Sequence, residues 1–236
     1  TNTDLHIELA GQNFTNHIRE NVYPGRGIVI GRNHENSWIV IYWIMGRSSN
    51  SKNRILRYEN GILKTKAADP SLMEYPALII YNAMRDLDNR IVVSNGCQTD
   101  TICEGLMKGE SIYTSLHTER HETDAPNYTP RISGLIEQKE SSMILVKITK
   151  SDFSVDHSEH HFYRYSEIPL GYGYCLTTYM GDGNPLPSFH GDPIMLPLEG
   201  DVEQIADIYW QGLNADNRIS LAVRELEKYG KDHLKI

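Results

Sequence analysis

The amino-acid sequence predicts an α+β protein in which two mainly antiparallel sheets pack face to face and are flanked by helices. Segments with the residue pattern of strands come in two runs, and helical patterns lie between and after those runs. Of the 236 residues, 39% are hydrophobic and 23% are charged, which is ordinary globular usage. Because no repeat with a period of about 20–50 residues is present, we predict one domain over 1–236.

The first run of strands follows a polar N-terminal lead over 1–20. Strands are predicted over 27–32, 37–45, 54–58 and 62–66. The turn Glu59-Asn60-Gly61 joins the last two strands, because Asn-Gly readily supplies the positive φ of a tight hairpin. We expect these four strands to form one sheet.

Helices are predicted in the middle of the chain. The segment 69–86 has Pro76 near its first turn and apolar residues at helical spacing, which predicts a helix. A strand and two helices follow, over 89–94, from a cap at Thr99 or Asp100 to Lys108, and over 111–121.

A second run of strands and two final helices complete the chain. The strands are predicted over 131–137, 142–148, 155–165 and 173–179, and the helices over 202–213 and 217–228. The segment 181–197 between them contains four prolines and three glycines, so we predict a long loop without regular structure. Loops of this length are often functional, and this one is a candidate lid over a bound ligand.

Charge and cysteine content exclude several classes of protein. Lys and Arg number 23 against 31 Asp and Glu, and this net charge of −8 argues against general nucleic-acid binding. The longest apolar stretch, 37–46, is half of the roughly 20 residues that span a bilayer, so no membrane segment is predicted. Three cysteines without C-x-x-C spacing and the lack of a signal-like N-terminus favour reduced thiols and a cytoplasmic location.

Two glycine- and arginine-containing segments favour binding of an anion. In "YPGRGIVIGR", Arg26 lies where a strand begins and where glycines allow a ligand to approach the backbone. "GRSSNSKNR" over 46–54 combines arginines, serines and asparagines directly after a buried strand, a composition that suits phosphate. The alternatives are a solvated arginine in a turn and a merely polar loop.

Polar residues also gather near the ends of other predicted strands. "YNAMR" and "SNGCQTD" supply groups that can read the edge of a heterocycle or stabilise an oxyanion. Turn and capping chemistry is the alternative for the second segment. "HETDAPNYTPRI" joins His121 and Glu122, both able to exchange protons, to Arg131 at the start of a strand.

Two further patterns have simpler explanations. His157, Glu159 and His161 share one face of a predicted strand, which would suit a metal, but a solvated histidine-rich strand is the simpler explanation, and no metal site is predicted. Thr1 is a candidate N-terminal nucleophile, although processing alone can expose a threonine.

The segments "YPGRGIVIG", "GRSSNSKNR", "IIYNAMR", "VSNGCQTD" and "NYTPRI", in this order, resemble the archaeal-type IMP cyclohydrolase family. The resemblance implies a four-layer αββα sandwich like that of N-terminal-nucleophile hydrolases, without autoprocessing. It also implies closure of 5-formamidoimidazole-4-carboxamide ribonucleotide (FAICAR) to IMP with loss of water, in purine biosynthesis. Neither a cofactor nor a metal is implied.

This chemistry assigns roles to the residues of the motifs. Glu122 is the expected proton shuttle, with Tyr42 as its partner and His121 as a competing choice. Tyr81, Asn82 and Asn95 are expected to stabilise charge on the formyl oxygen. The expected substrate-binding residues are Arg26, Arg47 and Ser48 for phosphate, Arg54 and Arg131 for phosphate, ribose or a carbonyl, and Asn53.

The expected partner is a small purine ribonucleotide, with no nucleic acid and no membrane, and a homo-oligomer is left open. Two other functions also remain open at this point. The chain can be an inactive purine-nucleotide-binding module, or an amide hydrolase on the same scaffold.

Overall fold

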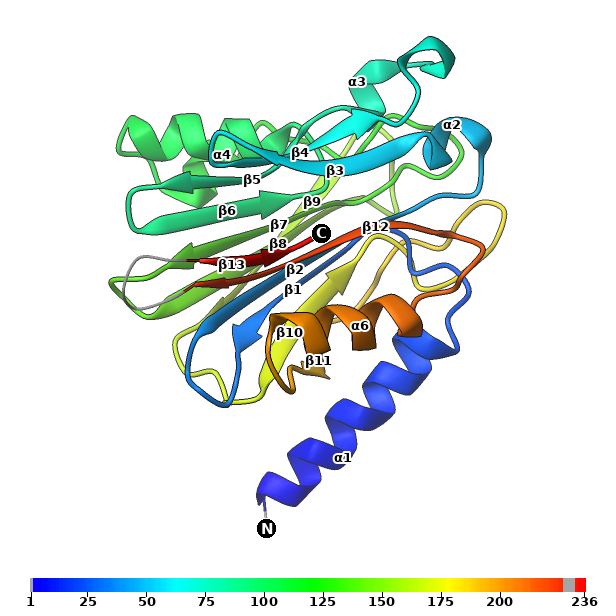
Figure 1. Ribbon diagram of the computed structural model, residues 1–236. Coiled ribbons are helices and arrows are strands. Elements are labelled where there is room, and N and C mark those ends of the chain that lie inside the picture. Colours follow the sequence, from blue (N-terminus) through cyan, green and yellow to red (C-terminus); the bar gives the residue numbers. More distant parts are fainter. Residues whose placement is uncertain (1, 227–231) are drawn as a thin grey trace. The chain divides into compact units, whose positions relative to one another are not determined.

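The computed structural model describes residues 2–226 and 232–236. The chain divides into two units. The first, which we call the terminal unit, comprises Thr1–Arg47 and Glu167–Ile236, and the second, the central unit, comprises Ser48–Ser166. Each unit is built around one β-sheet (Figure 1).

The terminal unit contains a six-stranded sheet in the order β11-β10-β1-β2-β12-β13. The strands are β1 (Gly27–Arg32), β2 (Trp38–Met45), β10 (Tyr172–Thr177), β11 (Ile194–Pro197), β12 (Arg218–Leu226) and β13 (His233–Lys235). All neighbouring strands pair antiparallel. Every residue of β2 is buried, as expected for a strand that reads WIVIYWIM and lies inside the sheet.

Helices cover one face of this sheet. They are α1 (Asn2–Phe14), the π-helical turn η1 (Thr15–Arg19) and α6 (Val202–Gly212). Figure 1 shows α1 in blue and α6 in orange on the same side of β10 and β11. Ile41, Trp43 and Val223 from the sheet form one hydrophobic core with Phe14 and Tyr209 from the helices. A capping box between Asp201 and Gln204 fixes the start of α6.

The central unit contains a seven-stranded sheet whose strands follow the order of the chain. They are β3 (Arg54–Glu59), β4 (Ile62–Ala67), β5 (Asn82–Leu87), β6 (Arg90–Ser94), β7 (Arg131–Glu137), β8 (Ser142–Lys150) and β9 (Ser158–Tyr165). Helices α4 (Gln98–Met107) and α5 (Ile112–Ser115) contribute Ile102, Leu106 and Ile112 to the core beneath them. The shorter helices are α2 (Ser49–Lys52), η2 (Pro70–Leu72) and α3 (Pro76–Ile79).

The predicted α+β class with two mainly antiparallel sheets and several helices is confirmed. Most predicted strands are present within two or three residues of their expected bounds, including the hairpin at Asn60-Gly61. The four-layer stacking and the single domain stay predictions.

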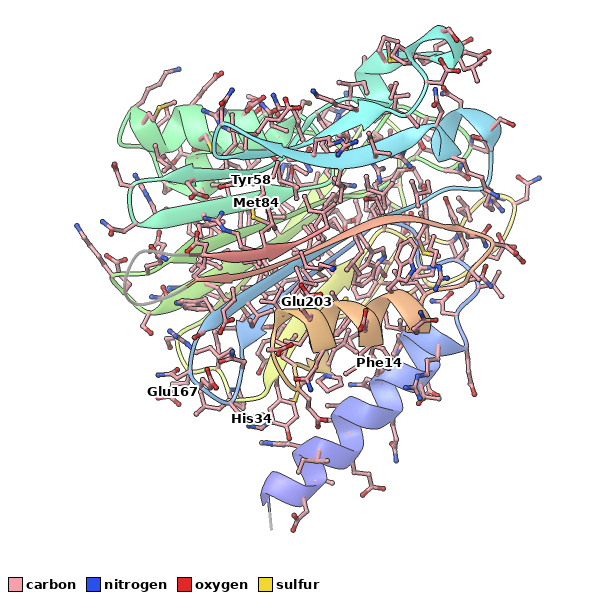
Figure 2. The ribbon with its side chains drawn as sticks, viewed as in Figure 1. Phe14, His34, Tyr58, Met84, Glu167 and Glu203 are labelled. Carbon is pink, nitrogen blue, oxygen red and sulfur yellow. The ribbon has the colours of Figure 1, made fainter. Side chains whose placement is uncertain are left out.

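The helix predicted over 69–86 is wrong. Only η2 and the four-residue α3 are helical there, and Asn82–Leu87 is strand β5. Pro76 is at the start of α3, as predicted. Met84, labelled in Figure 2, pairs with Leu63 of β4 and with Val93 of β6, so the hydrogen bonds of both neighbouring strands outweigh the local helical spacing.

The last predicted helix, over 217–228, is also wrong. Residues 218–226 form β12, whereas 227 and 228 lie outside the described residues. Leu221 and Val223, two positions apart, both point into the same hydrophobic core, and β12 hydrogen-bonds to β2 on one side and to β13 on the other. The spacing of two residues between side chains on the same face is that of a strand and not of a helix.

Smaller corrections concern the segments predicted to be polar or loop-like. The lead over 1–20 is largely helical and buries Ile18, because η1 packs beneath α6. The loop over 181–197 ends in strand β11, which pairs with β10. The four strands of the first run belong to two sheets, not one. The helix predicted over 111–121 ends at Ser115.

Candidate functional site

The predicted site residues are distributed over both units. Arg26, Tyr42 and Arg47 belong to the terminal unit. The central unit carries the others, which are Ser48, Asn53, Arg54, Tyr81, Asn82, Asn95, Glu122 and Arg131.

Arg26 and Tyr42 are held by the strands around them. The backbone N–H of Arg26, just before β1, donates to Oγ1 of Thr178, and its carbonyl accepts the N–H of Thr178. Tyr42 is fully buried and lies opposite Ile28 and Ala222. Because Trp43 faces the helices, Tyr42 faces the other side of the sheet.

Arg47 follows β2 and is bound to the loop 181–197. Its Nη1 donates to Oδ1 of Asp182 at 2.6 Å and to the carbonyl of Gly183 at 3.0 Å. The guanidinium also lies 5.1 Å from the centre of the Tyr23 ring, within range of a cation–π interaction. Arg47, which is predicted to bind phosphate, is thus half-exposed and forms an ion pair with Asp182 of the candidate lid.

The segment after Arg47 is folded by its own side chains. Ser48 caps α2 by accepting the N–H of Ser51. The Asn53 carboxamide donates to the carbonyl of Asp69 at 2.8 Å and accepts its N–H at 2.7 Å. Arg54 is buried, and its Nε donates to the carbonyl of Ser51. These contacts give a structured polar loop, and a role in substrate binding stays a prediction.

Tyr81 and Asn82 stand at the start of β5. Tyr81 is buried, and its backbone N–H donates to Oγ1 of Thr65. The Nδ2 of Asn82 donates to both carboxylate oxygens of Asp100 in the first turn of α4, each at 3.1 Å. Arg85 donates to the same carboxylate at 2.6 Å, and this hydrogen bond raises the pKa of Arg85. Asp100 thereby ties β5 to α4 and does not cap the helix as predicted.

Asn95 and Arg131 lie together where β6 and β7 meet α4. The Asn95 Oδ1 accepts the N–H of Ile132 at 3.0 Å and Nε2 of Gln98 at 2.8 Å. The Oε1 of Gln98 in turn accepts Nη1 of Arg131 at 3.1 Å. The structure therefore brings together two residues that are 36 positions apart in the sequence, and places a buried glutamine between them.

His121 and Glu122 are adjacent in a non-helical segment after α5, and both are buried. The His121 Nδ1 lies 2.7 Å from Oγ of Ser158 on β9. Burial, with a smaller contribution from the charge of Arg120, lowers the pKa of His121. Glu122 is anchored through its backbone N–H, which donates to the carbonyl of Thr129. The imidazole is thus fixed to β9, and the role of Glu122 as proton shuttle, with His121 as the competing choice, stays a prediction.

The histidines and the glutamate that were considered as metal ligands lie in β9 or directly before it, where the structure shows contacts of other kinds. Nε2 of His161 lies 3.6 Å from Glu159, and His160 contacts the carbonyl of Glu119. Among residues 2–226 and 232–236, no group of three or more His, Cys, Asp or Glu side chains is arranged to hold a metal ion. Nor does any helix in these ranges have the length and apolarity to cross a membrane.

The structure adds residues that the sequence did not single out. Asp182, Tyr23 and Gln98 each contact a predicted site residue. Gln98 stood within a segment with site-like composition, but Asp182 lies 135 positions from Arg47, and no local pattern joins them.

Comparison with known proteins decides the family. The sequence model of the family described as IMP cyclohydrolase-like protein matches residues 23–231. The chain belongs to this family. Its relatives include an IMP cyclohydrolase of Methanocaldococcus jannaschii, 25% identical over 89% of this chain and 96% of that protein. Another, from Haloquadratum walsbyi, is 28% identical over 78% of this chain and 82% of the relative. The IMP cyclohydrolase of Methanosphaera stadtmanae is 32% identical over 50% of this chain and 59% of the relative.

The matched range of the IMP cyclohydrolase-like family contains every predicted site residue, from Arg26 to Arg131. It also contains the loop 181–197 with Asp182. Helices α1 and η1 precede the matched range. They lie in the segment that was predicted to be a polar N-terminal lead. The resemblance found in the five motifs is therefore confirmed at the level of the family.

Proposed function

We propose that this chain is an IMP cyclohydrolase that closes FAICAR to IMP and releases water. The family match over 23–231 carries the proposal, since relatives aligned over most of the chain are named IMP cyclohydrolase. The substrate is then a small purine ribonucleotide. The three unpaired cysteines are compatible with a reducing, cytoplasmic location.

Positioning supplies much of the rate in such a reaction. The carboxamide nitrogen of FAICAR attacks the formyl carbon of the same molecule, so both groups must be held within reach of each other. Well-oriented intramolecular reactions gain about 7–11 kcal/mol over bimolecular ones. Side chains fixed by hydrogen bonds on two sides, as Arg131 is, suit this task.

The chemical steps require one oxyanion stabiliser and one proton shuttle. A new C–N bond forms, and negative charge builds on the formyl oxygen, which Tyr81, Asn82 or Asn95 stabilises. The resulting carbinolamine carries a hydroxyl that leaves as water when Glu122 protonates it. The ring nitrogen loses its proton in the same dehydration, which gives IMP and returns the shuttle to its starting state.

An ultraviolet assay with purified protein, FAICAR and chelator tests the function. We expect formation of IMP well above the uncatalysed rate. Binding of IMP without turnover would support an inactive nucleotide-binding module instead. Hydrolysis of amides that depends on Thr1, which lies outside the described residues, would support an amide hydrolase.

A further inference from the structure

Gln98, the first residue of α4, is fully buried and links two predicted site residues. Its Nε2 donates to Oδ1 of Asn95 at 2.8 Å and to the carbonyl of Ile132 at 3.3 Å. Its Oε1 accepts Nη1 of Arg131 at 3.1 Å. Both ends of the carboxamide are therefore used, and its orientation is fixed by the donors and acceptors around it.

The guanidinium of Arg131 is fixed on two of its nitrogens. Nε donates to the carbonyl of Arg120 at 2.7 Å, and Nη1 contacts Oε1 of Gln98 and the sulfur of Cys97. Within the described ranges, Nη2 has no hydrogen-bond partner. Two N–H groups of a rigidly held guanidinium are therefore available to an incoming oxygen atom.

Gly96 allows this close arrangement. A Cβ atom at position 96 would lie 2.7 Å from Oε1 of Gln98 and 2.8 Å from Nη1 of Arg131. The carboxamide of Gln98 and the guanidinium of Arg131 thus pack directly against the backbone of Gly96, which has no side chain. A methyl group there would push both side-chain ends away without removing any hydrogen-bonding group.

A carboxylate near Arg131 indicates which kind of oxygen it suits. Oε2 of Glu119 lies 3.9 Å from Nε of Arg131, while Oε1 of Glu119 accepts Thr101 Oγ1 at 2.7 Å. The two opposite charges largely offset each other locally. A neutral acceptor, such as a carbonyl or hydroxyl oxygen, is therefore favoured over a phosphate dianion.

We propose that Gln98 is a positioning residue that holds Arg131 so that Nη2 binds a neutral oxygen of the base or ribose of the purine ribonucleotide. This inference rests on the proposed function. It also narrows the role of Arg131, for which the sequence left phosphate, ribose and a carbonyl open as alternative ligands.

Two substitutions separate positioning from simple packing. Q98M keeps the length of the side chain but removes its three hydrogen bonds, to Asn95, Ile132 and Arg131. Q98E keeps an oxygen acceptor for Arg131, which gains a carboxylate partner, and replaces the donor to Asn95 and Ile132 by a second oxygen. Calorimetry with IMP and with inosine, which lacks the phosphate, gives a readout that does not depend on turnover. Q138M, in the exposed turn after β7, is the matched control.

We expect Q98M to weaken binding of IMP and of inosine by the same factor, about tenfold, and Q98E to stay within about threefold of the unaltered protein. Q98M should add nothing in an R131A background, because Gln98 acts through Arg131. Equal weakening by Q98M and Q98E, additive effects with R131A, or an effect on IMP but not inosine would each overturn the proposal.

G96A provides the same test if Q98M fails to fold. It should weaken IMP and inosine alike, and unchanged binding of both would contradict the proposal. The two levels of inference remain distinguishable. If FAICAR is not converted but IMP binding responds as expected, the proposed function fails and the positioning role stands. If FAICAR is converted and the affinity for IMP is unchanged by every substitution at Gln98, only the positioning role fails.

Discussion

Arg47 and Asp182 form a short ion pair, with Nη1 and Oδ1 2.6 Å apart, between the end of β2 and the loop that precedes β11. The carbonyl of Gly183 accepts a second hydrogen bond from the same nitrogen. Since both side chains are roughly half-exposed, the pair is worth only about 0.2–1 kcal/mol. A bound phosphate can therefore compete with Asp182 for the guanidinium.

Replacing Arg47 tests its role as the phosphate ligand. A lost charge-assisted hydrogen bond costs about 1.5–3 kcal/mol, so R47A should raise the apparent KM for FAICAR about ten- to hundredfold. Inosine binding should stay unchanged, because inosine has no phosphate. R57A, at an exposed position of β3, serves as the control. An unaltered KM would remove Arg47 from phosphate binding.

Asp182 is expected to weaken phosphate binding by competing for Arg47. D182N keeps an oxygen acceptor for Arg47 and for the N–H of Gly183 but removes the negative charge. IMP should then bind up to about fivefold more tightly, which is the upper worth of an exposed ion pair. Calorimetry with IMP and inosine measures the effect. Tighter binding of inosine as well would show that the change does not act through phosphate.

Glu122 is the residue on which the dehydration step depends in the proposed mechanism. E122Q keeps the shape of the side chain and removes its ability to exchange a proton. General acid–base catalysis contributes at least about a hundredfold, so kcat should fall by that factor or more. The dissociation constant of IMP should stay within about twofold. E140Q in the turn between β7 and β8 is the control, and an unaltered kcat would exclude Glu122 from the chemistry.

Local sequence was sufficient to predict the strands whose pattern and turns agree. The run 38–45 is apolar throughout, and Asn60-Gly61 fixes the hairpin of β3 and β4. It was insufficient for 218–226, where Ile219, Val223 and Leu226 have helical spacing although the segment is a strand between β2 and β13. Hydrogen bonds from strands far away in the sequence decide such segments.

The candidate site shows the same division between local and distant information. Polar residues near the ends of strands, such as Asn95 and Arg131, could be selected from the sequence as candidates. Their partners could not, because the contact of Gln98 with Arg131 spans 33 positions and that of Arg47 with Asp182 spans 135. The spacing of residues within a motif carries no information on such pairs.

His121 makes the stability of the protein depend on pH. Burial lowers its pKa, so the folded protein favours the neutral imidazole, whereas the unfolded chain takes up a proton near pH 6.5. The contribution of this group is fully present above about pH 6.5 and declines as the pH falls toward its lowered pKa in the folded state. H121Q should therefore reduce the loss of unfolding free energy between about pH 7 and pH 5.

Urea unfolding of both proteins across this range measures the difference. Burial also lowers the pKa of His17, so part of the pH dependence should remain in H121Q and be common to both proteins. Identical slopes of unfolding free energy against pH would show that His121 does not contribute.

Replacing Phe14 tests whether α1 is an integral part of the terminal unit. Helix α1 lies outside the range matched by the family model. Its ring meets Tyr209 of α6 edge to face at 5.1 Å, and Figure 2 shows it where the two helices approach each other. A Cβ at Gly212 would lie only 2.8 Å from this ring, so the packing is tight. F14A should lower the free energy of unfolding by about 3–5 kcal/mol. L5A, at a position that is 63% exposed on the same helix, should change it by less than about 0.5 kcal/mol. If urea unfolding gives equal values for the two variants, α1 does not contribute to the core as the contacts of Phe14 indicate.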